Sequence, residues 1–81
     1  MFVKKKSMEN YIDFIEINAD VRFGKPCVKG TRITVYDVLG FLATGMTTPQ
    51  IIKDFPELST NAIRACLAYA AQKERKAKIA A

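Results

Sequence analysis

The sequence predicts a small, mainly α-helical domain in which a short β element precedes three helices. A length of 81 residues fits one domain. Apolar residues recur at helical spacing in three segments after residue 34. The segment before them alternates apolar and acidic residues and is then broken by glycine and proline. We therefore expect a flexible N-terminus at 1–10, a domain at 11–72 and a basic C-terminal extension at 73–81.

The β element begins with residues 11–17, where alternating apolar and acidic side chains predict a short strand. So short a strand must pair either with the hairpin that follows it or with another chain. Residues 22–26 contain a glycine and a proline and predict a turn. Cys27–Lys29 and Arg32–Ile33 are then predicted to be two short strands on either side of a Gly-Thr pair.

The first helix is predicted to follow Thr34, whose hydroxyl can cap it while Asp37 lies at the capping-box spacing. Gly45 is predicted to end the helix in the left-handed conformation that favours glycine. One face of the helix should be buried, because apolar residues recur there at i, i+3, i+4 and i+7. These residues are Val35, Val38, Leu39 and Leu42.

Two more helices are expected, one on each side of Pro56. Thr47 is predicted to cap the second helix, with Gln50 at the capping-box spacing. Ser59 is predicted to cap the third and longest helix, which extends to Lys76 or beyond. The predicted buried stripe of this helix consists of Ile63, Cys66, Leu67 and Ala70.

A short helix, a break of a few residues and a longer capped helix have the spacing of a helix-turn-helix. In that arrangement the leading end of the third helix faces solvent and presents Ser59, Thr60, Asn61 and Arg64. Asparagine can read adenine in the major groove, and arginine can read guanine or bind a phosphate.

Two further features bear on this DNA-reading hypothesis. Thr47 and Thr48 could hold a phosphate through their hydroxyls and the backbone N–H groups at the start of the second helix. Ala65 and Ala68, expected further along the reading face, offer only methyl contacts. Because few polar side chains remain on this face, the alternative to DNA reading is that the three helices only pack together and bind no nucleic acid.

The formal net charge of +5 comes from lysines and arginines near the two ends of the chain. Within the body, however, Arg22, Lys25, Lys29 and Arg32 occupy a stretch that contains no acidic residue. This stretch and the tails could hold a polyanion through counterion release. Alternatively, the terminal lysines only keep a small protein soluble.

The sequence contains no histidine, which argues against Ser-His or Cys-His catalysis and against common zinc sites. We expect no catalytic residue, no bound metal and no cofactor. Cys27 and Cys66 are expected to be small structural residues, with Cys66 buried. A membrane span and a signal peptide are not expected either, and the predicted location is the cytoplasm.

The run from Phe23 to Val35 reads F-G-K-P-C-V-K-G-T-R-I-T-V. It resembles the signature G-K-P-x-[IV]-x-G-T-R-I-x-V of the domain of unknown function 433 family. The likeness continues through residues 42–46, 51–58 and 63–70. It therefore covers roughly residues 15–71.

The resemblance implies a small prokaryotic domain with a homeodomain-like helix-turn-helix, similar to the VapB-type antitoxins of type II toxin–antitoxin systems. Such antitoxins are commonly encoded beside a PIN-like ribonuclease toxin, which they are taken to neutralise while repressing their own operon as dimers. Within the signature, Lys25, Lys29 and Arg32 either contact DNA phosphates or enter the toxin's acidic active site. In the structural alternative, Gly30–Arg32 forms a turn and Arg32 pairs with a carboxylate such as Asp37.

Under the antitoxin hypothesis, a basic side chain takes the place of the toxin's metal. The candidates lie in the C-terminal extension and are Lys73, Arg75, Lys76 and Lys78. Thr48–Pro49 stands where the family usually has an acidic start to the second helix, which removes negative charge near the DNA face. The alternatives are a stand-alone DNA-binding transcriptional regulator and a dimerisation module that does not bind DNA.

Overall fold

The computed structural model describes residues 13–80, with side chains described for residues 13–73. This part of the chain is mainly helical and contains three α-helices and a short β element, as predicted; the β element is a two-stranded antiparallel sheet. The elements are β1 (Ile15–Glu16), the 3-10 turn η2 (Arg22–Gly24), β2 (Cys27–Val28), α2 (Val35–Ala43), α3 (Thr48–Asp54) and α4 (Thr60–Ala80).

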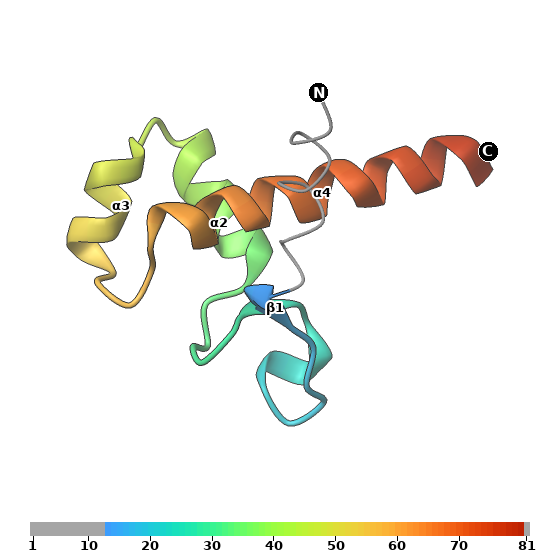
Figure 1. Cartoon of the computed structure of the whole chain (residues 1–81), viewed down its shortest axis with the longest axis horizontal. Helices are drawn as coiled ribbons and strands as arrows, with labels where there is room; N and C mark the ends of the chain where they lie inside the picture. Colours follow the sequence, from blue (N-terminus) through green and yellow to red (C-terminus); the bar gives the residue numbers. More distant parts are fainter. Residues whose placement is uncertain (1–12, 81) are drawn as a thin grey trace.

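Helix α4 is the longest element and organises the others around its first half. It contacts α2, α3 and β1. Figure 1 shows α2 and α3 beside the N-terminal half of α4, with the β hairpin on another side, while the second half of α4 extends away from these elements. Among the described residues, no helix combines the length and the apolar character needed to cross a membrane.

Strands β1 and β2 form the sheet, with Ile15 opposite Val28 and Glu16 opposite Cys27. The N-terminal strand thus pairs within its own chain, which decides between the two alternatives left open by the sequence. It is shorter than predicted, because only Ile15–Glu16 is a strand within the predicted range. Tyr11 and Ile12, like the whole predicted N-terminus at 1–10, lie outside the described residues.

The second strand also connects the hairpin to the helices. The Val28 N–H donates to the Ile33 carbonyl at 2.9 Å, and Cys27 forms an isolated antiparallel bridge with Thr34. The Val35 N–H then donates to the Pro26 carbonyl at 2.9 Å. The strand predicted at Arg32–Ile33 is therefore only a single bridge centred one residue later, because the chain turns into α2 at once.

Thr34 starts α2 with the predicted capping box. Its hydroxyl accepts the Asp37 N–H at 2.9 Å, and the Asp37 carboxylate accepts the Thr34 N–H at 3.0 Å. At the other end, Gly45 has φ +99°. The N–H groups of Gly45 and Met46 donate to the Leu42 and Phe41 carbonyls, which is a Schellman ending.

The next two helices also begin as predicted. Thr47 and Gln50 form a second capping box, and the Ser59 hydroxyl accepts the Ala62 N–H at 3.0 Å. The connection between α3 and α4 is short and holds Leu58 in the core. The residues of the main core cluster are Val28, Val35, Val38, Ile51, Leu58, Ala62, Ile63 and Cys66.

The buried face of α4 differs from the prediction. Leu67 was expected to be buried but is 47% exposed, whereas Ala65 is only 4% exposed. The buried residues of the helix are Ala62, Ile63, Ala65 and Cys66, so the buried face includes Ala65 and leaves out Leu67. Cys27 and Cys66 are free cysteines and both are buried, as expected for Cys66.

Thr34→Ala should lower the free energy of unfolding by about 1–2 kcal/mol, because it removes the cap of a buried helix start. The threonine is only 2% exposed, so water cannot replace its hydroxyl. Thr47→Ala is the matched control at an exposed cap and should cost about 0.5–1 kcal/mol. Urea unfolding followed by circular dichroism measures both losses, and an equal or smaller loss for Thr34→Ala would contradict the prediction.

Candidate nucleic-acid interface

The leading end of α4 presents three polar side chains to solvent. Thr60, Asn61 and Arg64 are exposed, as the sequence predicted for a DNA-reading helix. Ser59, just before them, is also exposed, but its hydroxyl caps the helix through the Ala62 N–H. In residues 13–73 no ion pair or hydrogen bond engages the Asn61 amide or the Arg64 guanidinium, so both groups are available to a ligand.

Beyond Arg64, the residues on the outward face of α4 are not the ones that were predicted. Ala65 was expected to offer its methyl group to DNA, but it is buried and cannot do so. Ala68 is half-buried. The exposed residue that follows Arg64 on this face is Leu67, so the face changes from polar to apolar along the helix.

The start of α3 has few groups left for a phosphate. The Thr47 hydroxyl accepts the Gln50 N–H at 3.3 Å, and the Gln50 side chain accepts the Thr47 N–H at 2.8 Å. Pro49 has no N–H, and Thr48 is half-buried. The hydroxyl and N–H groups expected to bind phosphate here are therefore largely engaged within the chain.

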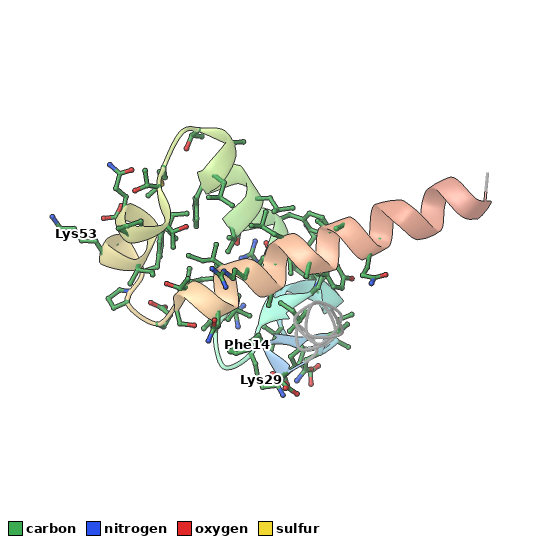
Figure 2. The ribbon with its side chains drawn as sticks, turned by 45° about the horizontal axis from the view of Figure 1, so that its top comes forward. Phe14, Lys29 and Lys53 are labelled. Atoms are coloured by element: carbon green, nitrogen blue, oxygen red, sulfur yellow. The ribbon has the colours of Figure 1, made fainter. Side chains whose placement is uncertain are left out.

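A second basic surface lies on the hairpin, away from α3. Lys25, Lys29 and Arg32 are exposed, and none of them forms an ion pair within residues 13–73. Figure 2 shows Lys29 and Lys53 on well-separated parts of the molecule. Lys53 is an exposed cation in the last turn of α3 that the sequence analysis did not single out.

The structural alternative for the signature predicted a turn at Gly30–Arg32 and an ion pair between Arg32 and Asp37. The structure contains the turn but not that ion pair. Gly30 has φ +81°, and the Thr31 hydroxyl donates to the Val28 carbonyl at 2.9 Å and accepts the Ile33 N–H at 3.0 Å. Arg32 does not pair with Asp37, however. Arg22 takes that position, with its Nη1 3.2 Å from the Asp37 carboxylate and 2.9 Å from the Arg32 carbonyl.

The hydrogen bonds of the Asp37 carboxylate determine the direction in which its pKa is shifted. Partial burial raises the pKa of Asp37, but hydrogen bonds from Thr34 and the Arg22 guanidinium outweigh it, so the pKa lies below its ordinary value.

Burial raises the pKa of the Cys66 thiol to about 11, which keeps it protonated at neutral pH. Among the described residues, no cluster of His, Cys, Asp or Glu could hold a metal ion.

The predicted toxin-binding residues all lie on the second half of α4. The backbone remains helical through Ala80, so residues 73–80 of the predicted extension continue this helix. Lys73 is exposed, and its Nζ lies 5.9 Å from the centroid of the Tyr69 ring. The side chains of Arg75, Lys76 and Lys78 lie outside those that the structure describes.

Residues 15–70 match a protein family described as "Protein of unknown function (DUF433)". The chain belongs to the DUF433 family. This assignment confirms the resemblance seen in the signature and rests on more than half of the chain.

Two other proteins are similar to this DUF433 domain. One is the uncharacterized protein y4eO of Sinorhizobium fredii, which is 33% identical over 58 residues; the match covers 72% of this chain and 26% of y4eO. The DUF433 chain thus spans about a quarter of that relative's length. The other is the crystal structure of a DUF433 member from Anabaena variabilis, with a TM-score of 0.72 and 22% identity, covering 93% of this chain and 76% of that one. This likeness shows a shared fold.

The depressed pKa of Asp37 predicts how stability depends on pH. An acid with a lowered folded-state pKa stabilises the fold above its unfolded pKa of about 3.9, and the contribution is lost as pH falls through the folded pKa. Asp37→Asn should therefore melt below the wild type at neutral pH, and the gap should shrink below about pH 4. Melting curves from neutral to acidic pH measure this gap, with the exposed Asp54→Asn as the control. A constant gap would show that ionised Asp37 does not stabilise the fold.

Proposed function

We propose that this DUF433 domain is the antitoxin of a type II toxin–antitoxin system. As a dimer it binds operator DNA through α3 and α4, which act as a homeodomain-like helix-turn-helix, and it neutralises a PIN-like ribonuclease. The observation that carries the proposal is the exposure of Asn61 and Arg64, without side-chain partners in residues 13–73, at the leading end of the longest helix.

The packing of α3 against α4 supports the DNA-binding part. Helix α3 has seven residues and is followed by a short connection to α4. Ile51 on α3 and Leu58 in the connection are both buried beside Ile63 of α4. Such anchoring leaves the outer face of a recognition helix free to enter the major groove.

The chemistry of the outer face also suits DNA. An asparagine amide can form two hydrogen bonds with adenine, and an arginine can do the same with guanine. Asn61 and Arg64 lie three residues apart, which places them on one side of the helix. Thr60 and the exposed Lys53 could then contact phosphates on either side.

The antitoxin part rests on the family resemblance and on charge. The active site of a PIN-like ribonuclease is lined by acidic, metal-binding residues, and a basic side chain could occupy the place of the metal. Lys73, Arg75, Lys76 and Lys78 provide such side chains on the helical extension of α4. A stand-alone regulator would show the same DNA binding but no ribonuclease encoded beside its gene, and a dimerisation module would bind no DNA.

The first test concerns base reading by Arg64. Arg64→Ala should weaken binding to the DNA upstream of the gene by about 1–3 kcal/mol, because a side chain that reads a base contributes that much. Lys53→Ala is the control, since a phosphate contact should weaken binding to operator and random DNA alike. Gel-shift titrations at several salt concentrations measure both. If Arg64→Ala loses the same affinity on random DNA, Arg64 does not read a base.

The second test concerns the C-terminal extension. Deleting residues 73–81 should abolish inhibition of the co-encoded ribonuclease, because it removes the cations expected in the acidic site. Dimerisation should survive the deletion, as measured by light scattering. A variant with Lys73, Arg75, Lys76 and Lys78 all changed to glutamine keeps the length and should also lose inhibition. Full inhibition by either variant would refute the assignment of this segment.

A further inference from the structure

An exposed leucine lies on the outward face of α4. Among the described residues, the large apolar side chains that are exposed are Ile17, Phe23, Tyr36 and Leu67. The first three lie on the hairpin or on α2, and the backbone of Phe23 is also strained, with φ 60° in the turn η2. Leu67 is 47% exposed and shares its helix with the candidate DNA-reading side chains.

Exposed residues recur along one side of α4 and form a stripe, here called the α4 stripe. Its members are Thr60, Arg64, Leu67 and Ala71. They follow the spacing i, i+4, i+7 and i+11, which returns to the same side of an α-helix. Asn61 is also exposed and lies beside the first of them. Leu67 therefore continues, toward the C-terminus, the surface that presents Arg64.

The length of the α4 stripe fits the major groove. Thr60 and Leu67 are seven residues apart, which is about 10 Å along the helix axis. The recognition helix of a homeodomain contacts the groove over a span of about seven residues. A helix that docks in this way through Asn61 and Arg64 also brings Leu67 against the edges of the bases.

Leucine recognises a different feature of the groove from its polar neighbours. Its side chain neither donates nor accepts a hydrogen bond, so it cannot read the donors and acceptors that Asn61 and Arg64 read. The apolar feature of the major groove is the C5-methyl group of thymine. Contact between the Leu67 side chain and this methyl group removes apolar surface of both from water, which is favourable.

Charge favours DNA over a second copy as the occupant of the α4 stripe. From Thr60 to Lys73, α4 contains no acidic residue. Asp54 and Glu57 are exposed acids, but both precede the helix, whereas Leu67 lies about two turns into it. A second copy docked on residues 60–73 would offer no carboxylate to Arg64, whereas DNA offers phosphates and base acceptors.

We propose that Leu67 contacts the C5-methyl group of a thymine in the operator. The inference rests on the proposed function, because it requires α4 to lie in the major groove. It makes Leu67 a specificity-determining residue, and it adds thymine to the adenine and guanine that suit Asn61 and Arg64.

Replacing thymine with deoxyuridine tests this contact, because it removes the methyl group and keeps every hydrogen-bonding group of the base. The probe is the DNA upstream of the gene, prepared with deoxyuridine throughout. The full wild-type chain should bind it about fourfold more weakly for each methyl group that Leu67 contacts, as for the loss of one buried methyl-sized group. Fluorescence-anisotropy titrations of both DNAs at one salt concentration measure this affinity ratio.

Leu67→Ala assigns the effect to the side chain, because alanine shortens it and favours a helix. This variant should bind thymine DNA more weakly than the wild type, and its thymine-to-deoxyuridine affinity ratio should fall toward one. Lys53→Ala is the matched control, since an exposed cation that contacts phosphate should weaken binding to both DNAs and leave the ratio unchanged. The wild-type ratio needs no variant, so it tests the contact even if Leu67→Ala folds poorly.

The outcomes separate this inference from the proposed function. If the wild type binds the upstream DNA no better than random DNA, the DNA-binding part of the proposed function fails, and this inference fails with it. If the wild type prefers the upstream DNA but binds its thymine and deoxyuridine forms equally, or if Leu67→Ala keeps the wild-type ratio, only the inference is overturned. It is also overturned if light scattering finds Leu67→Ala monomeric where the wild type is a dimer, because the α4 stripe then contacts a second copy.

Discussion

The Asp37 carboxylate joins the two parts of this small domain. One of its oxygens accepts hydrogen bonds from the Thr34 N–H and from the Arg22 guanidinium. The first of these bonds starts α2, and the second fixes the turn of the β hairpin. A two-stranded sheet this short is not stable alone in water, so it depends on such links to the helices. The Asp37 carboxylate thus adds a side-chain link to the backbone bonds from Val28 and Val35 that orient the hairpin relative to the helices.

Local chemistry explains which features could be predicted from the sequence. The caps at Thr34, Thr47 and Ser59 are formed by residues within three positions of one another, so their spacing alone predicts them. The left-handed Gly45 at the end of α2 is equally local. The family signature could also be recognised from the sequence, because it is a contiguous run of residues.

Features that depend on tertiary packing escaped the sequence analysis. Leu67 and Ala65 are close on α4, and helical spacing alone could not decide which of them faces the core. The partner of Asp37 was equally undetermined, because Arg22 and Arg32 both lie within reach of it in the sequence, and only the course of the hairpin favours Arg22. The strained, exposed Phe23 carries no sequence signal, since a phenylalanine is ordinarily expected inside. The exposure of the candidate DNA-binding residues on α4 could be predicted from the sequence. The Thr47 hydroxyl, by contrast, accepts a hydrogen bond as the cap of its own helix, which limits its availability to a phosphate.

The uninterrupted course of α4 has a geometric consequence. The helix has 21 residues, and a helix of that length spans about 30 Å. Its first two turns carry the side chains that we propose for the operator, and its last turns carry the cations that we propose for the ribonuclease. Under that proposal, the two partners would contact opposite ends of one continuous helix rather than a shared set of residues.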